Sequence, residues 1–320
     1  MTVEANYIQE GESLDFTPAT AMVPGQVVQL PDGRAGVVND AIAAAAKGSV
    51  SVCGVYEIAK TTSMVILDGG RVYWDYSANA AYFKKVDDRD FYVGIAIGDA
   101  AATATTMRVA FNVAPVYVSD LARDTYLTVP VGTQALGGFL PPQRNGGSLT
   151  LNITATSEAQ KVDALALAGF ATGANAIIEG AFRIPTAGSG SASDYNLGIA
   201  TGTHATDADS ITNYLFIHLD GASTNINAQS KDGTTTVAST DTTTDFVAGG
   251  ALTNRVEFWM DTRDPTDVQI YVEGVLVLAS TVFAIAAGTN TWYLLAHLEK
   301  TTGTETAVMA VDFLRARIQE

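Results

Sequence analysis

The stretch NRVEFWMDTRDPTDVQIYVEGVLVLA, residues 254–279, constrains the fold more than any other part of this chain. Apolar and polar side chains alternate along it in two successive runs, and this period of two is typical of half-buried β-strands. Asp264-Pro265 supplies a polar turn between the runs, and Glu273-Gly274 supplies a second turn before a further apolar segment. The stretch therefore predicts three strands in series, an antiparallel meander.

Composition favours a β-rich chain of two domains. The 320 residues exceed the usual length of one domain, and 47% of them are hydrophobic, which is enough to bury a substantial core. Only 16% are charged, against about 25% in ordinary proteins. Thr, Ser, Asn and Gly must therefore form much of the polar surface, which favours β-structure over a helical enzyme.

The net charge of −16 argues against one class of partner. An acidic chain is repelled by nucleic-acid phosphates, and Lys84-Lys85 is the one adjacent basic pair, so we expect no nucleic-acid binding. The alanine-rich run 41–46 is too short to span a bilayer, and residues 1–10 lack a signal-peptide pattern. We therefore expect no membrane partner and synthesis in a cytoplasm. Cys53 is expected to be a small buried residue rather than a nucleophile.

The chain divides into three parts by its pattern. Residues 1–113 hold short alternating runs separated by glycine turns, which predict a small β-barrel-like domain. Residues 39–47 are the only helix candidate there, because alanines favour helix. Residues 114–147 are rich in Pro and Gly but keep apolar side chains, so we expect an extended connector arm that lies on a surface.

Residues 148–320 are expected to form the second domain, an antiparallel β-sandwich of jelly-roll type. Its expected strands lie near residues 149–153, 177–184, 214–219, 292–298 and 308–318, together with the meander. Residues 157–170 carry an ambiguous pattern that favours strand and loop over helix. Residues 201–210 and 230–244 are polar, and we expect them to be loops. The predicted fold class is all-β throughout.

The N-terminal motifs ANYIQEGESLDFTP, PGQVVQL, GVYEIAK, GGRVYWD and FYVGIAIGDA, in this order, resemble a family of small phage proteins encoded among head genes. These are the capsid decoration or head-stabilising proteins, and the similarity covers residues 5–112. The resemblance implies a protein on the outer capsid surface, typically a trimer at local threefold positions. The partners it implies are the major capsid protein and further copies of the chain. It brings no active site and no cofactor.

The C-terminal motif RVEFWMDTRDPTDVQIYVEG, followed by WYLLAHLEK, resembles the concanavalin-like jelly-roll domains that phages append to structural proteins. This is a likeness of fold, and function does not follow from fold. Such domains bind sugars in some proteins and are structural or adhesion modules in others. If the domain contacts a glycan, Trp259, Tyr271 or Trp292 would stack on the sugar rings.

No pattern in the chain predicts an enzyme. A phosphate-binding loop needs Gly-x-x-x-x-Gly-Lys-Ser/Thr, and none of the 29 glycines lies in that pattern. A glycosidase needs two carboxylates about 5–10 Å apart. Glu257 and Asp261, on one face of a strand, would lie about 13 Å apart. His204, His218 and His297 are too scattered to predict a zinc site, and the latter two are expected to be hydrogen-bonded strand residues.

Two further polar regions can be interpreted either as solvated loops or as functional sites. Asp207-Ala208-Asp209 and Asp220-Gly221 would supply oxygens for calcium, but the calcium-loop pattern of EF-hands is absent. Residues 188–191, GSGS, are flexible and polar, and they do not form a nucleophile elbow between a strand and a helix. We expect solvated loops in both places, with no metal and no cofactor.

An aromatic cluster in the N-terminal part predicts either core or subunit contact. Its members surround one expected hairpin, with Trp74 pointing inward: Tyr73, Trp74, Tyr76, Tyr82 and Phe83.

The two resemblances together imply a structural, non-enzymatic protein of a phage head that binds the lattice, stabilises it and displays an outward sandwich. The alternative is a carbohydrate-binding or adhesion module on a virion appendage, and a glycosidase is the third hypothesis.

Overall fold

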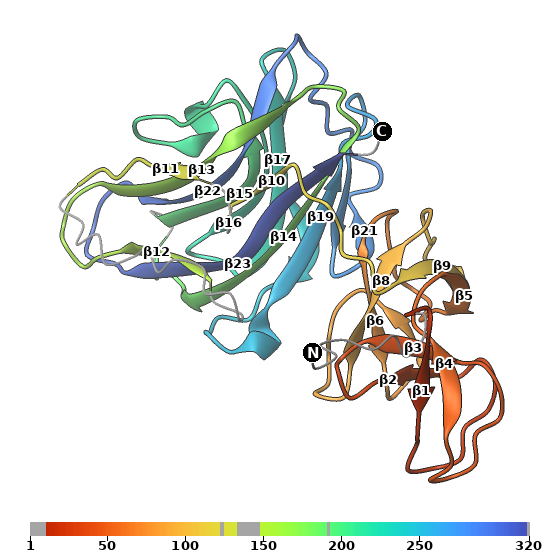
Figure 1. The fold of residues 1–320 in the computed structure, drawn as a ribbon. Coiled ribbons are helices and arrows are strands. Elements are labelled where there is room, and N and C mark those ends of the chain that lie inside the picture. The colour runs from red at the N-terminus through yellow and green to blue at the C-terminus, as the bar shows by residue number, and fades with distance from the viewer. Residues whose placement is uncertain (1–10, 122–124, 133–147, 191–192, 319–320) are drawn as a thin grey trace, which may run out of the picture. The chain divides into compact units, whose positions relative to one another are not determined.

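The computed structural model describes residues 11–121, 125–132, 148–190 and 193–318. The chain divides into two compact units, Met1–Pro115 and Val116–Glu320. Figure 1 shows that both units are built from strands, so the predicted all-β class is confirmed. Among the described residues, helical structure is limited to two short 3₁₀ turns, η1 (Ala208–Ser210) and η2 (Leu252–Asn254). No helix in these ranges is long and apolar enough to cross a membrane.

The N-terminal unit contains two open antiparallel sheets. The first has the order β1-β4-β3-β2, and its strands are β1 (Ser13–Phe16), β4 (Gly48–Ser51), β3 (Ala35–Val38) and β2 (Val27–Gln29). The second has the order β5-β9-β8-β6-β7, and its strands are β5 (Val55–Ala59), β9 (Thr106–Phe111), β8 (Phe91–Ala96), β6 (Arg71–Asp75) and β7 (Ala80–Tyr82). The described strands close no barrel, so the expected barrel-like shape is refined to two small sheets.

Asn112 joins the two sheets of the N-terminal unit. Its side-chain oxygen accepts a hydrogen bond from the Ala35 amide at 2.9 Å. Its side-chain nitrogen donates to the carbonyl oxygens of Ala35 at 2.9 Å and Val52 at 2.6 Å. The residue follows β9 with φ 58, a left-handed conformation that Asn adopts more readily than most residues. One amide group therefore satisfies three backbone groups between the end of one sheet and two segments of the other.

The C-terminal unit begins with a sheet of seven strands. Its main order is β10-β23-β14-β19-β20-β21, and β12 also pairs with β23. The strands are β10 (Ser119–Asp120), β12 (Leu149–Ile153), β14 (Ala176–Thr186), β19 (Val256–Asp261), β20 (Gln269–Val272), β21 (Val275–Val277) and β23 (Ala307–Ile318). The neighbouring strands β19, β20 and β21 are the predicted meander, which is confirmed.

The second sheet of this unit also has seven strands, in the order β11-β13-β22-β15-β16-β17-β18. They are β11 (Tyr126–Thr128), β13 (Gln160–Ala171), β22 (Thr291–Lys300), β15 (Ser193–Ala200), β16 (Asn213–Asp220), β17 (Asn225–Asp232) and β18 (Thr236–Asp245). All pairings are antiparallel. The preference for strand within residues 157–170 is confirmed by β13.

One apolar core lies between the two seven-stranded sheets. Alternate residues of β19, such as Phe258 and Met260, point into it from the first sheet. Leu197 and Leu294 enter it from the second sheet. Alternation places one face of each strand inward. The other face of each sheet carries polar side chains and, on the second sheet, also a small apolar cluster that includes Phe216 and Leu295. This arrangement is the predicted antiparallel β-sandwich.

The second unit begins with two short strands, each at an edge of one of its sheets. β10 pairs with β23, and β11 pairs with β13, so these short strands extend one edge of each sheet. Residues 133–147, the remainder of the expected connector, lie outside the described ranges.

Three local expectations are wrong. Residues 39–47 form no helix: Ile42 instead makes an isolated bridge with Met22 and is buried in the core of the four-stranded sheet. Two turns of alanine are too weak a signal to outweigh that burial. Cys53 is exposed, because it follows β4 in a turn. Residues 230–244 are mostly strand rather than loop, because β18 is an edge strand that keeps polar Thr side chains on both faces.

Candidate functional site

A row of three tyrosines crosses the outer face of the five-stranded sheet. Tyr73 on β6 lies opposite Tyr82 on β7 and Tyr92 on β8. The Tyr73 and Tyr92 rings meet edge to face, with centroids 5.6 Å apart. All three are half-buried, while Trp74, next to Tyr73 on β6 but on the opposite face of the sheet, is buried as expected. We call these three residues the tyrosine row.

The other predicted contact residues surround the tyrosine row. Phe83 is buried, and its ring stacks on Tyr82 at 4.6 Å. Tyr76 is 49% exposed, and the guanidinium of Arg89 lies over its ring at 4.1 Å. The structure therefore divides the predicted set into core residues and residues with exposed surface. Sequence reasoning missed Tyr92, which lies next to Tyr73 only because β8 pairs with β6.

Further along the same sheet there is an open hollow of about 310 Å³. It is lined by the β5–β9 pair, where Glu57 lies opposite Arg108, and by Ile97 and Asp99 beyond β8. Nearby, Val55 is 57% exposed on β5. Half-buried tyrosines, arginine and exposed aliphatic side chains on one sheet face are the composition that protein interfaces favour.

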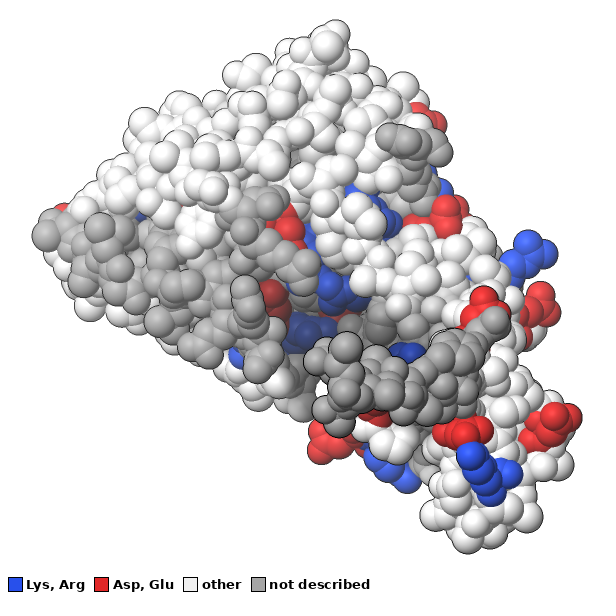
Figure 2. Space-filling view, in the orientation of Figure 1, with Lys and Arg blue, Asp and Glu red and all other residues white. Residues whose placement is uncertain are grey.

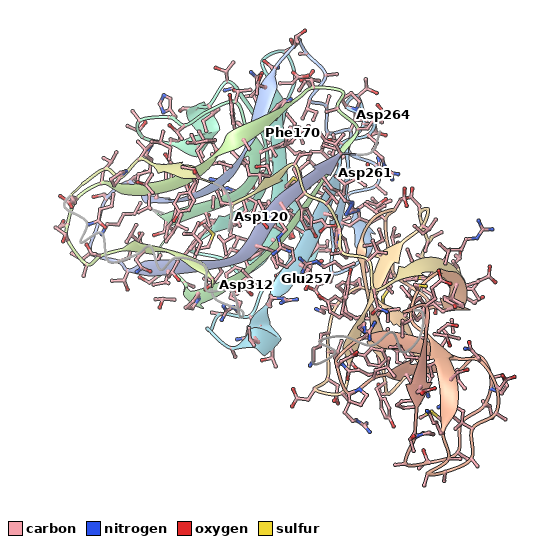
Figure 3. The ribbon with its side chains drawn as sticks, in the orientation of Figure 1. Asp120, Phe170, Glu257, Asp261, Asp264 and Asp312 are labelled. Atoms are coloured by element: carbon pink, nitrogen blue, oxygen red, sulfur yellow. The ribbon has the colours of Figure 1, made fainter. Side chains whose placement is uncertain are left out.

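A second polar surface is the outer face of the sheet that contains β14, β19 and β23. All five arginines between residues 148 and 318 lie on or beside it, and each is paired with a carboxylate. The pairs are Arg183–Asp312, Arg255–Glu257, Arg263–Asp261, Arg315–Asp120 and Arg317–Glu179. Figure 2 shows charged atoms of both signs gathered over these strands, and Figure 3 labels four of the acidic residues there.

Two of the predicted glycan contacts lie on this arginine face. Trp259 on β19 is half-buried, and it is in register with Glu179 on one side and Tyr271 on the other. Tyr271 is 9% exposed. Trp292 is not near them: it lies on the other sheet with no exposed surface, and its indole N–H donates to Thr172 Oγ1 at 2.8 Å. Trp292 is therefore a core residue and is unsuited to stacking on a sugar.

A third polar cluster lies on the outer face of the other sheet, centred on His297 of β22. Its Nδ1 lies 2.5 Å from Asp163 of β13, and its Nε2 lies 3.0 Å from Glu299. Lys161 Nζ lies 2.7 Å from the second oxygen of Asp163. All four side chains are buried. Burial alone would lower the pKa of His297, but the hydrogen bonds to Asp163 and Glu299 outweigh it and raise the pKa to about 9.

The His297 cluster continues across the sheet through neighbouring strands. Asn196 on β15 lies beside His297, and His218 Nδ1 on β16 lies 2.9 Å from the Asn196 side-chain oxygen. Gln229 on β17 donates to that same oxygen at 3.1 Å. Burial lowers the pKa of His218. The expectation that His218 and His297 are hydrogen-bonded strand residues is confirmed. Their proximity was missed because the members of the cluster come from five strands, β13, β15, β16, β17 and β22.

Metal binding and the glycosidase geometry find no support in these arrangements. Within the described ranges, no group of three His, Cys, Asp or Glu side chains is placed to hold a metal ion. Glu257 and Asp261 are each paired with an arginine, as the ion pairs above show. Their two carboxylates do not face each other across a sugar-sized gap, because they lie on one side of one strand.

Several solved structures are similar to part of the chain. A family 7 polysaccharide lyase, the alginate lyase AlgAT5, is 13% identical, with a TM-score of 0.40, and covers 57% of this chain and 84% of its own. The laminarinase catalytic domain from Thermotoga maritima is 15% identical, with a TM-score of 0.40, and covers 58% and 82%. The Emp47p carbohydrate recognition domain is 11% identical, with a TM-score of 0.40, and covers 63% and 94%. At such scores we draw no conclusion from these likenesses.

No curated protein is similar enough to this chain to match it. The N-terminal part does match a protein family, described as phage cement protein, over residues 8–111. The match lies within the N-terminal unit, Met1–Pro115, and includes the tyrosine row and the hollow on the five-stranded sheet. It agrees with the resemblance that the motifs of residues 5–112 indicated. The N-terminal unit of this chain is thus similar to the phage cement proteins over residues 8–111, and a β-sandwich follows it in the chain.

Proposed function

We propose that this chain is a structural decoration protein of a phage head, and that its N-terminal unit attaches it to the outer surface of the capsid. The match of residues 8–111 to the phage cement proteins carries this proposal. Its partners would be the major capsid protein and further copies of the chain, as a trimer at local threefold positions. The protein would be made in the host cytoplasm and act on the assembled virion.

The outer face of the five-stranded sheet is the surface we assign to the capsid contact. The tyrosine row presents large, rigid side chains that lose little conformational entropy when they are covered. Arg108 and Glu57, next to the hollow, supply polar groups at its margin. A few aromatic anchors within a polar rim account for most of the affinity in typical interfaces.

Attachment at many lattice positions would stabilise the head by linkage. A protein that binds the assembled lattice better than the separated subunits raises the free energy required for separation. Contacts that bridge several subunits make weak single contacts effective. The proposed activity is therefore adhesive and requires no catalytic residue, cofactor or metal ion.

The experiment that tests this proposal is binding of purified protein to heads that lack it. The double variant Tyr73→Ala, Tyr82→Ala should bind at least about tenfold more weakly, because aromatic anchors are worth more than 1.4 kcal/mol in typical interfaces. Tyr271→Ala, in the other unit, is the matched control and should bind as the wild type does. Co-sedimentation with the heads gives the affinity, and circular dichroism shows that each variant is folded. Equal binding by the double variant would remove the tyrosine row from the contact.

A second candidate function is glycan binding by the C-terminal sandwich. One observation favours it: among the described residues, Nη1 of Arg315 and both Nε and Nη2 of Arg317 have no acceptor, and both arginines lie on the same sheet face as Trp259. Sugar hydroxyls are acceptors for such donors, and aromatic rings stack on sugar faces. A glycan array with the full-length protein tests the candidate, with Trp259→Ala as the variant and Tyr76→Ala as the control. Absence of binding to every sugar would leave the structural role alone.

A further inference from the structure

The connection between β15 and β16, residues 201–212, folds back over the outer face of its own sheet. We call it the strap. Its η1 turn lies on the far side of the second sheet from the sandwich core, as Figure 1 shows. Ala208 and Ile211 of the strap are buried against Phe216 and Leu295, which point outward from the sheet. The strap thus covers a small apolar cluster that is separate from the main core.

Polar anchors hold the strap at two other strands. Lys161 on β13 donates through Nζ to the carbonyl oxygen of His204. Gln229 on β17 donates to Asp209 Oδ1 at 2.6 Å, and Lys231 Nζ lies 3.4 Å from the Asp209 carbonyl oxygen. These contacts span the sheet from β13 to β17. The strap is therefore attached on both sides of the His297 cluster, at β13 and at β17.

The strap brings carboxylates close to carboxylates of the sheet. Asp194 on β15 is in register with Glu299 on β22 and with Asp220 on β16. Asp207 and Asp209 of the strap add to the negative charge that raises the pKa of Asp194. The cations on this face are otherwise engaged: Lys161 with Asp163, His297 between Asp163 and Glu299, and Lys231 with the Asp209 carbonyl. Within the described ranges, Asp194 has no cationic partner. An ionised Asp194 would therefore repel the strap without compensation.

We propose that the strap is a pH-dependent cover, closed over the His297 cluster while Asp194 carries a proton and loosened when that carboxyl group ionises. Loosening would expose Asn196, His218 and Gln229, which are buried in the closed state. The element that moves is a surface loop held by a few contacts, the kind of segment that opens locally at low free energy. This behaviour is independent of capsid attachment, which we assign to the other unit.

The pH range follows from the groups around Asp194. Burial is the largest cause, and with the neighbouring carboxylates it raises the pKa of Asp194 to about 7. Because the closed state holds this proton more tightly than an open state, raising the pH favours opening. The effect is at most about tenfold per pH unit, and it ends above pH 7. Burial lowers the pKa of His218, which disfavours a positive charge on this residue that would offset an ionised Asp194.

Hydrogen exchange of the full-length protein tests the proposal. The Ile211 amide, which donates to Ala208 at 3.1 Å, reports on closure of the strap. Between pH 5 and pH 8 its protection factor, corrected for intrinsic exchange, should fall at least tenfold more than that of amides in β15 and β22. In Asp194→Asn, which keeps the shape of the protonated acid, this extra fall should disappear. Asp245→Asn, an exposed carboxylate on β18, is the control and should retain it.

Two results would overturn the proposal. The first is a strap protection factor in the wild type that follows the core strands at every pH. The second is an extra fall of the same size in Asp194→Asn, which would assign the transition to another group. The wild-type profile decides the matter by itself if the variant does not fold.

Discussion

Single side chains join parts of this protein that are distant in sequence. Asn112 makes three hydrogen bonds to Ala35 and Val52, which lie 77 and 60 residues earlier in the sequence. Removing the amide leaves these backbone groups without partners. Each buried unsatisfied group costs about 1–3 kcal/mol.

We therefore expect Asn112→Ala to lower the free energy of unfolding of the N-terminal unit by about 2 kcal/mol or more. Asn39→Ala is the control, since the Asn39 side chain also bonds to three residues but in an exposed position. Urea denaturation, followed by intrinsic fluorescence, compares the two variants. A loss for Asn112→Ala that is no larger than the loss for Asn39→Ala would contradict this account of the junction.

His297 makes the stability of the sandwich depend on pH. Its pKa is raised from the ordinary 6.5 to about 9 by Asp163 and Glu299, against the opposing effect of burial. A raised pKa stabilises the fold fully below pH 6.5, and this contribution is lost as the pH rises through 9. The free energy of unfolding should fall by at most about 3 kcal/mol over this interval.

Chemical denaturation at pH 6.5, 8 and 9.5 measures this slope. His297→Gln should be less stable than the wild type at pH 6.5 and should show a much smaller fall. His204→Gln, at an exposed position in the strap, should keep the wild-type slope. The contribution of Asp194 ends near pH 7, so it does not account for a fall above that pH. A slope unchanged in His297→Gln would show that another group is responsible.

Strands and turns differ in how much of their structure the sequence determines locally. The hairpin between β20 and β21 was predicted from Glu273-Gly274, and both residues have positive φ, at 52 and 80. Two consecutive positive φ values fit the turn type that suits the right-handed twist of a two-residue hairpin. Such a signal is local, which is why it could be predicted.

Gly274→Ala should lower the free energy of unfolding by about 1 kcal/mol, because a Cβ is strained at this φ. Gly202→Ala is the matched control: a Cβ there meets no atom within 4 Å. Thermal unfolding of both variants, monitored by circular dichroism, gives the comparison. If the two glycines tolerate alanine equally well, the proposed turn strain is absent.

Other elements could not be predicted because their neighbours decide them. The alanines of residues 39–47 favour helix locally, but burial of Ile42 keeps that segment extended. β15 has no simple alternation, since nearly all of its residues are buried between β22, β16 and the strap. The His297 cluster has the same origin: Asp163 and His297 are adjacent only through the pairing of β13 with β22.

The candidate surfaces were predicted to different degrees for the same reason. Tyr73 and Tyr82 flank one hairpin, so their proximity follows from a short stretch of sequence. Trp259 and Tyr271 lie on consecutive strands of the meander and were also found. The ion pairs of the arginine face join segments as distant as Asp120 and Arg315, which no local pattern connects.

The two units of the chain are expected to have separate roles. A fragment of residues 1–115 contains both sheets of the N-terminal unit and the whole family match. We expect it to fold and to sediment with heads with an affinity similar to that of the full-length chain. Residues 116–320 should fold and remain in the supernatant. Circular dichroism shows whether each fragment is folded, and capsid binding by the second fragment alone would reverse our assignment of roles.

The central claim, that this chain decorates a phage head, is tested most directly by labelling intact virions with a gold-conjugated antibody against the protein. We expect label spread over the whole head and none on the tail, after which averaging at the local threefold positions would locate the N-terminal unit. Label confined to the tail, or absent from particles, would contradict the head assignment and would favour glycan binding by the sandwich instead.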